Sequence, residues 1–325
     1  MIVDCHAHLV PPDLLAAIRK DAQKFPNVRQ IEADGSLALA FSGGKPTRPV
    51  SKPLSDISSR LTWMAKQGVD KQVVGGWVDM FGYELPGAEA EAWARLANGC
   101  LLATAKAEPR FVPLATVPLG DGARAASVLK DAIKAGFAGA MIGTLPRGPG
   151  STLDAKDLDP FWQAADEAGA LIHIHPSYDA GDVRVNDFGL ANGLGRITDA
   201  AVAVARLISA GHVAKYKGVK FFAPMGAAAL PFVLGRLKRN AAITPNVGDP
   251  VAALASIYTD TILHDARVLK FVIEMMSVER LMMGSDMPFP IGDTEPMKIV
   301  AEADLSKAQV DSINGGLAAQ LFKLQ

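Results

Sequence analysis

Short apolar runs alternate with longer amphipathic stretches along most of this chain. The short runs are typical of buried strands, and the stretches between them repeat apolar positions with the period of a helix. Eight runs predict strands, at residues 1–9, 71–77, 110–117, 138–143, 170–175, 219–223, 257–261 and 281–285. Because strands that alternate with helices favour a parallel sheet, the pattern predicts an α/β fold of the (β/α)8 TIM-type barrel class.

One segment breaks this alternation. Residues 31–41 form two alternating runs joined by Asp34 and Gly35, and Asp-Gly is typical of a tight hairpin turn. We therefore expect a small antiparallel hairpin insertion over residues 27–53, after the first strand, that caps the barrel. This insertion is too short to bury a core of its own. Residues 1–325 are accordingly predicted to form a single domain.

The composition argues against several classes of protein. The chain has 325 residues, of which 49% are hydrophobic and 21% charged, and its formal net charge is -1. Such a balance, without a basic cluster, does not favour binding to nucleic acid or to an anionic membrane. No apolar run reaches the roughly 18 residues of a transmembrane helix, and Asp4 and His6 interrupt any signal-peptide core. We expect a cytoplasmic protein with reduced cysteines that acts on a small molecule.

Histidines stand at the ends of two of the predicted strands. His6 and His8 lie two residues apart on the first strand, so they share a face, whereas Cys5 should face away from them. His175 ends the fifth strand, and Asp286 follows the eighth. Strand ends meet at one face of a barrel, and neutral imidazole and carboxylate are ligands for divalent metals. These side chains are therefore candidates for one metal site.

Several motifs occur in the same order as in a known family. They are His6-Ala7-His8, Met80-Phe81, residues 136–144, His175-Pro176, Tyr258-Thr259-Asp260, His264-Asp265, Gly284-Ser285-Asp286 and Pro288-Phe289-Pro290. With them the chain resembles the amidohydrolase superfamily, and within it the group typified by aminocarboxymuconate-semialdehyde decarboxylase. The resemblance implies that His6, His8, His175 and Asp286 bind one divalent metal, usually zinc and in some members manganese. Binuclear members carry a bridging lysine on the fourth strand, and this chain has none there.

The chain departs from the family pattern after the sixth strand. Where the family usually has a histidine followed by glycines, this sequence has Pro224 and Met225. The family histidine handles a proton, which neither proline nor methionine can do at neutral pH. Three interpretations stay open: another residue such as His173 transfers the proton, the metal polarises the substrate without a base, or the protein binds a ligand without catalysis. His173 shares a face with His175, and it is also a candidate for a hydrogen-bonded core residue.

Other side chains are candidates for catalysis or substrate binding. His264 either orients a substrate or anchors a helix start with Asp265, and we group it with His173 and Asp286 as candidate catalytic residues. Asp260 either fixes an imidazole tautomer or caps a turn. Arg48 stands where family members bind a carboxylate in a bidentate fork, and it can also be interpreted as a solvated loop residue. The other candidates for substrate binding are Trp77, Phe81, Arg147, Arg184 and Met225, whereas Arg60 and His212 are expected at the surface.

These observations lead to one predicted function and two alternatives. We expect a metal-dependent, non-oxidative decarboxylase of a small unsaturated or aromatic carboxylic acid, as in aromatic catabolism. The first alternative is a metal-dependent hydrolase or hydratase that acts on a ring-cleavage product. The second is a non-catalytic ligand-binding relative, because Pro224 and Met225 replace the histidine. By analogy with the family, a homodimer is expected.

Overall fold

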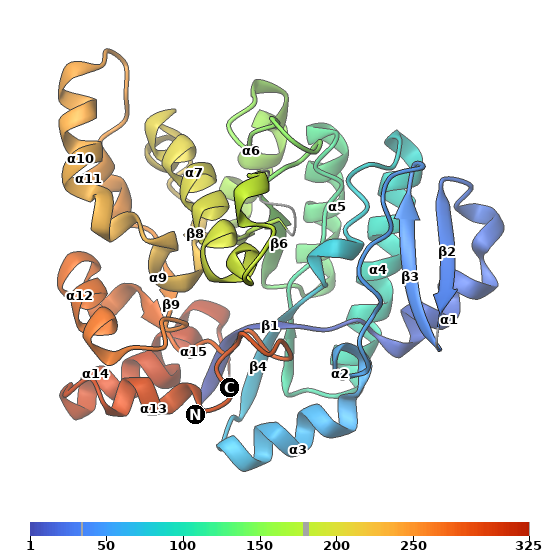
Figure 1. The fold of residues 1–325 in the computed structure, drawn as a ribbon, viewed down its shortest axis with the longest axis horizontal. Helices are drawn as coiled ribbons and strands as arrows, with labels where there is room; N and C mark the ends of the chain where they lie inside the picture. The colour runs from blue at the N-terminus through green and yellow to red at the C-terminus, as the bar shows by residue number, and fades with distance from the viewer. Residues whose placement is uncertain (34, 178–181, 325) are drawn as a thin grey trace.

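Eight parallel strands close into a ring in the computed structural model, which describes residues 1–33, 35–177 and 182–324 (Figure 1). Around the ring they are β1 (Val3–His8), β4 (Lys71–Gly75), β5 (Phe111–Pro113), β6 (Gly139–Gly143), β7 (Leu171–His175), β8 (Lys220–Phe222), β9 (Thr259–Asp260) and β10 (Leu281–Met282). Parallel ladders form three groups, β1–β4–β5, β6–β7–β8 and β9–β10. Single parallel bridges join these groups, at Ala115–Ala140, Phe222–Tyr258 and Ala7–Met287. The predicted α/β barrel is confirmed.

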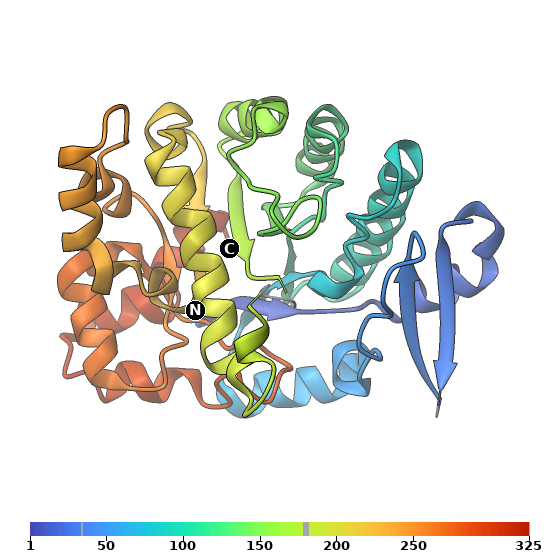
Figure 2. The same ribbon diagram turned by 45° about the horizontal axis from the view of Figure 1, so that its top comes forward.

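Helices cover the outside of the ring. The main ones are α3 (Ile57–Gln67), α4 (Gly87–Ala107), α5 (Gly122–Ala135), α6 (Asp159–Ala168), α7 (Arg196–Ser209), α10 (Leu230–Ile243) and α12 (Ala266–Met276). Figure 2 shows α4 to α7 standing side by side in chain order. Their ends follow local signals: the Asp121 side chain accepts hydrogen bonds from two backbone N–H groups at the start of α5, and Gly136 ends that helix in the left-handed conformation. None of the described helices has the length and apolar character needed to cross a bilayer.

Two apolar layers hold the barrel together. One cluster unites residues from several strands with residues of α15 (Leu317–Phe322), and it contains Val73, Leu114, Met141, Phe222 and Ala318. The larger layer lies between the strands and the helices, where Phe161 and Trp162 of α6 are fully buried. Burial of this kind is the main driving force for folding, and it leaves the carboxyl ends of the strands for chemistry.

A two-stranded sheet stands beside the barrel. β2 (Val28–Ala33) pairs antiparallel with β3 (Ser36–Phe41), and Figure 1 shows the pair at the edge of the molecule. Leu37, Leu39 and Phe41 of β3 belong to a second buried cluster with residues of α1 (Pro12–Lys20) and α4. Asp34, which we expect in the connecting turn, lies outside the described residues.

The structure corrects several sequence-based expectations. Arg60 and His212 are buried, with 0% and 7% of their surface exposed, although both were expected at the surface. The reason for Arg60 is that polar groups from two strands meet it beneath α3, which a helical pattern does not reveal. The chain closes with α14 (Lys307–Asp311), a π-helical turn and α15.

Candidate metal centre

Four donor side chains converge at the carboxyl ends of the barrel strands. His6 and His8 come from β1, His175 is the last residue of β7, and Asp286 follows β10. One ligand atom from each of the four lies within 4.8 Å of the others. The three imidazoles are buried and Asp286 is half-buried. The structure thus brings together the four residues that the sequence singled out.

Hydrogen bonds fix the orientation of all three imidazoles. The Nδ1 atom of His6 lies 2.7 Å from Oδ2 of Asp260, that of His8 lies 3.2 Å from the Gly76 carbonyl, and that of His175 lies 2.8 Å from the Pro176 carbonyl. Because these oxygens accept, each Nδ1 carries the proton and each Nε2 presents a lone pair. A metal-bound histidine usually donates its other ring N–H to a carboxylate or a backbone carbonyl in this way.

The Nε2 atoms face one another and a carboxylate. Those of His6 and His8 are 3.3 Å apart, and Oδ1 of Asp286 lies 3.6 and 3.1 Å from them. Lone pairs at this separation repel one another unless a cation lies between them, and three imidazoles with one carboxylate suit a zinc-like divalent ion. Within the described residues, Oδ1 of Asp286 is buried without a hydrogen-bond partner, as expected of a ligand atom. The donor set therefore fits one metal ion.

The protonation tendencies of the donors also suit a metal. Burial and neighbouring positive charge hold the pKa of His175 well below its ordinary value, and burial likewise lowers the pKa of His8. For His6, burial opposes the charged form, but Asp260 and Asp286 outweigh it and raise the pKa. Burial alone would raise the pKa of Asp286, but its histidine neighbours and Arg196 have the larger effect and lower it. The group is therefore a carboxylate at neutral pH.

Asp260 links the centre to the segment that follows β8. Its Oδ2 atom accepts from His6, while Oδ1 accepts from the Met225 N–H at 2.7 Å and from the Ile262 N–H at 3.2 Å. Asp260 is fully buried. Both interpretations of this residue hold, because one carboxylate orients an imidazole and also stabilises a turn. The backbone of Met225, a predicted substrate contact, is thereby fixed beside the centre.

The segment after β8 has an unusual backbone. Five consecutive residues have positive φ: Met225 at 55°, Gly226 at 63°, Ala227 at 58°, Ala228 at 52° and Ala229 at 60°. The left-handed conformation costs about 1–2 kcal/mol for each residue with a side chain. This strained turn occupies the position of the family histidine, and no described residue of it carries an acid–base group.

His173 and His264, the other candidate catalytic residues, lie outside the four-residue cluster. The ring of His173 is fully buried one layer deeper, 4.4 Å from the His6 ring and 4.5 Å from the Phe222 ring. Burial holds its pKa well below the ordinary value, so it is neutral. Neither nitrogen of His173 has a hydrogen-bond partner among the described residues. His264 is exposed, and the adjacent Asp265 caps α12, which favours the helix-anchoring interpretation of that pair.

The predicted substrate contacts occupy different places. Arg48 makes a bidentate ion pair with Asp79, at 2.9 and 3.0 Å, and its guanidinium lies 5.1 Å from the Trp77 ring and 5.8 Å from the Phe289 ring. The Phe289 ring is in turn 5.1 Å from the His8 ring, so Arg48 lies on the approach to the centre. Arg147 pairs with Asp157, and Arg184 pairs with Asp182 at the surface.

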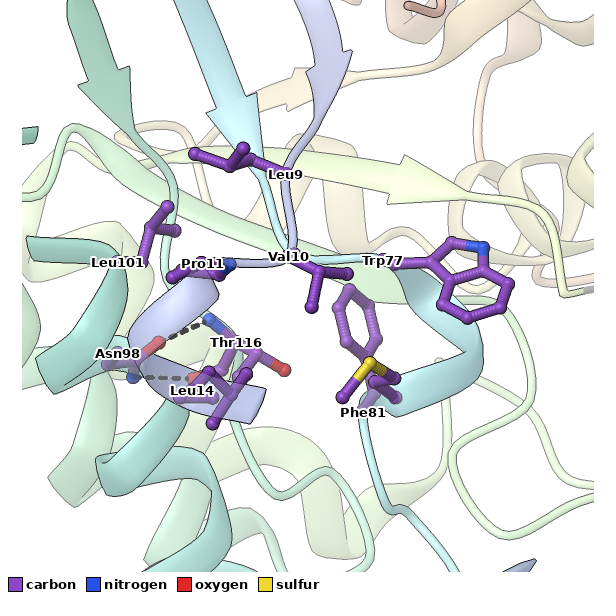
Figure 3. Close-up of a pocket in the computed structure, with 12 residues that line it drawn as sticks. Leu9, Val10, Pro11, Leu14, Trp77, Phe81, Asn98, Leu101 and Thr116 are labelled. Atoms are coloured by element: carbon purple, nitrogen blue, oxygen red, sulfur yellow. Dashed lines mark hydrogen bonds between the residues drawn. The ribbon is translucent and has the colours of Figure 1, made fainter. Parts of the chain in front are cut away.

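Trp77 and Phe81 line a small internal cavity next to the approach (Figure 3). Its other walls come from the end of β1, from α1 and from α4, and Asn98 there exchanges two hydrogen bonds with the Thr116 backbone. The cavity holds about 20 Å³, which suits a single water molecule rather than an aromatic acid. The aromatic rings therefore shape the wall beneath the approach.

Sequence reasoning missed Arg196. This residue begins α7, its Nε atom is buried, and its charge lowers the pKa values of Asp286 and His175. One turn later, Asp199 accepts hydrogen bonds from the Ser177 N–H at 2.9 Å and from the Thr144 hydroxyl. These bonds tie the first turn of α7 to the end of β7. Arg196 shares a helix face with Asp199, so its cation lies beside the centre, which no local motif announces.

Comparisons with known proteins find similarity along nearly the whole chain. A profile of the family described as amidohydrolase matches residues 3–324. A 2-amino-3-carboxymuconate-6-semialdehyde decarboxylase of Dictyostelium discoideum is 24% identical in an alignment 341 positions long that covers 99% of this chain and 91% of the relative.

Two solved structures share the fold along the whole chain. The 5-carboxyvanillate decarboxylase of Sphingomonas paucimobilis has a TM-score of 0.82 at 21% identity, and the alignment covers 100% of this chain and 99% of that one. The 5-carboxyvanillate decarboxylase of Novosphingobium aromaticivorans, complexed with manganese and 4-hydroxy-3-methoxy-5-nitrobenzoic acid, has a TM-score of 0.80 at 20% identity, with coverage of 100% and 96%.

Proposed function

Because the chain belongs to the amidohydrolase family, we propose that it is a metal-dependent, non-oxidative decarboxylase of a small unsaturated or aromatic carboxylic acid. The observation that carries this proposal is the convergence of three imidazole lone pairs and one carboxylate at the barrel's carboxyl end. His6, His8, His175 and Asp286 would hold one divalent metal, zinc or manganese. A cation bound there supplies positive charge that stabilises negative charge developing on the substrate.

The protein's own groups would bind the acid and handle the proton. Decarboxylation breaks a carbon–carbon bond, releases carbon dioxide and requires a proton at the carbon that is left behind. Among the candidate catalytic residues, Asp286 is the one that lies at the centre. Because it is a carboxylate at neutral pH, we assign it the transfer of this proton, which it would take up from solvent water and pass to the carbon. His173 and His264 stay predictions, because the first is enclosed beneath His6 and the second is exposed.

A panel of acids tests the reaction directly. Metal-loaded protein is mixed with hydroxybenzoates, their carboxylated derivatives and muconate semialdehydes, and released carbon dioxide is measured. Turnover with carbon dioxide supports the proposal, whereas a product without carbon dioxide favours the hydrolase or hydratase alternative. Tight binding without turnover favours a non-catalytic relative, which the replacement of the family histidine by Pro224 and Met225 motivates.

Two arginines are proposed to bind the substrate carboxylate. Arg48 lies on the approach between Trp77 and Phe289, and Arg196 lies at the start of α7, beside His175 and Asp286. Hydrogen bonds to charged groups contribute about 1.5–3 kcal/mol. We expect Arg48→Gln and Arg196→Gln each to raise KM for the acid about 10- to 100-fold.

Initial-rate kinetics measures this effect, and Arg184→Gln is the matched control. Arg184, like Arg196, follows β7 in the chain, but it is 86% exposed and pairs with Asp182 at the surface. Its KM should stay within twofold of the wild-type value. An unchanged KM in Arg196→Gln would remove Arg196 from the substrate site. An unchanged KM in Arg48→Gln would mean that Arg48 has only a structural role.

Asp260→Asn should weaken metal binding about 10- to 100-fold. The amide can accept from the Met225 N–H with its oxygen, but its NH2 group then faces Nδ1 of His6. Nδ1 must accept, so the proton moves to Nε2 and blocks the ligand lone pair. Titration with Co²⁺, followed by absorption, measures the change. Asp121→Asn, at the cap of α5, is the control and should bind as wild type; equal affinity in Asp260→Asn would contradict the assigned tautomer.

We also infer the organisation of the whole chain. Residues 1–325 would form a single domain. Residues 27–53, which include Arg48, would be a hairpin insertion that caps the barrel. Exposed apolar side chains on α10, Phe232 and Ile243, support a homodimer, and the expected location is the cytoplasm. Sedimentation velocity at micromolar concentration tests the dimer, and a monomer there would reject it.

A further inference from the structure

A buried carboxylate lies directly behind the donor residues. Asp4 of β1 is fully buried, and its Oδ1 atom accepts from the Ser285 N–H at 3.0 Å and from the His6 N–H at 3.2 Å. Its Oδ2 atom accepts from the Ser285 hydroxyl at 2.6 Å and from the Gln72 amide at 2.8 Å. These partners lie on β1 itself, on the neighbouring β4 and on the segment after β10.

Arg60 completes this arrangement from outside the barrel. It lies on α3, and it is fully buried. Its Nη1 group donates to the Gln72 side-chain oxygen at 2.7 Å, and its Nη2 group donates to the backbone carbonyl of His8. The Gln72 amide thus bridges the buried cation of Arg60 and the buried anion of Asp4. Burial lowers the pKa of Arg60 to about 10, so it keeps its charge at neutral pH.

The network touches the backbone next to three of the four donors. Asp4 holds the N–H of His6, and Arg60 holds the carbonyl of His8. Ser285 precedes Asp286, and its hydroxyl also accepts from the Met287 N–H at 3.1 Å. Asp286 itself has a φ of 57°, so its side chain leaves the strand in an unusual direction that these contacts keep in place.

Stability alone does not account for such a network. Removing two opposite charges from water costs several kcal/mol per ion, and apolar side chains of similar volume often stabilise a fold equally well or better. The strands could pack without it, since β1 and β10 already share backbone hydrogen bonds such as Cys5 N–H to the Met283 carbonyl at 2.8 Å. What the charged groups add is direction, because each one fixes a backbone atom beside a donor.

We propose that Asp4 and Arg60, joined by Gln72 and Ser285, are positioning residues that set the geometry of the metal centre from outside the barrel. The inference rests on the proposed metal binding by His6, His8 and Asp286. Neither residue touches the ion or the substrate. Their effect passes through the backbone of β1 and of the segment after β10, so it should appear in metal affinity and in coordination geometry.

Moving the negative charge from position 4 to position 72 by substitution tests the proposal. In Asp4→Asn the new NH2 group faces the Gln72 NH2 group, and Arg60 loses its nearby anion. In the double variant Asp4→Asn/Gln72→Glu, the amide at position 4 donates to a carboxylate at position 72, which accepts from Arg60. The chain keeps its net charge, and the Ser285 hydroxyl, which donates to Asp4 in the wild type, instead accepts from the new amide. Binding of Co²⁺ alone is followed through its visible absorption spectrum.

The expected result is a loss and a rescue. Asp4→Asn should bind Co²⁺ at least about 10-fold more weakly, as outer partners of metal ligands typically do when changed, with an altered band shape. The double variant should return to within about threefold of the wild-type affinity and restore the spectrum. Ser285→Ala provides a milder third variant should Asp4→Asn fail to fold, and it should also weaken binding.

Asn98→Ala is the matched control. Asn98 is buried on α4, and its side chain makes two hydrogen bonds to the Thr116 backbone and none to a donor residue (Figure 3). It should lose stability but keep the wild-type affinity for Co²⁺. Unchanged binding in Asp4→Asn and Ser285→Ala, an equal loss in Asn98→Ala, or a double variant without rescue would each overturn the inference. Absence of Co²⁺ binding in the wild type would instead reject the proposed metal site.

Discussion

His175→Ala is expected to lose metal affinity by more than about 100-fold, the upper end of the effect seen for outer partners of ligands. His6 and His8 lie on β1, and Asp286 follows the neighbouring β10, so these three donors approach from one side of the ring. His175 alone comes from β7, across the barrel. Without it the remaining donors leave one side of a tetrahedral ion uncovered.

Elemental analysis after dialysis measures this loss, together with titration by Co²⁺. The wild type should retain about one metal ion per chain, and the variant should retain almost none. His212→Ala is the control, because His212 is also a buried histidine whose nitrogens have no hydrogen-bond partner among the described residues, but it lies beside Trp162. Full metal content in His175→Ala would mean that His175 is not a ligand.

The parts of the site that local pattern determines could be predicted from the sequence. Side chains two apart on a strand share a face, and residues at strand ends gather at one face of a barrel. These two rules were enough to bring His6, His8, His175 and Asp286 together, although they lie on three segments far apart in the chain. The eight apolar runs likewise determined the ring, because each run is short and is followed by a helical stretch.

Features that depend on partners distant in sequence could not be predicted in this way. Arg60 stands on a helix where its charge favours solvent, and only Gln72 and the His8 carbonyl make its burial possible. Arg196 follows a loop without a motif. Ala227 to Ala229 are typical of right-handed helix, but contacts with Thr259 and Asp260 hold the turn in the left-handed region.

The close approach of β6 and β7 leads to a second prediction with a large effect. A Cβ atom at Gly139 of β6 would lie 1.9 Å from the Leu171 carbonyl oxygen of β7, far inside van der Waals contact. That oxygen belongs to the backbone, so it cannot rotate away as a side chain would. Gly139→Ala must therefore separate β6 from β7, whose ladder pairs Gly143 with His175.

We expect Gly139→Ala to lower the free energy of unfolding by at least about 3 kcal/mol, the upper range for an overpacked core. Urea denaturation monitored by tryptophan fluorescence measures it as a lower midpoint. Gly99→Ala is the control, because Gly99 lies inside α4 with no atom within 4 Å of its added methyl group. That substitution should raise the free energy by about 0.5–1 kcal/mol. A change below 1 kcal/mol in Gly139→Ala would show that the two strands can separate at this point without breaking the barrel, and that His175 does not depend on the ladder for its position.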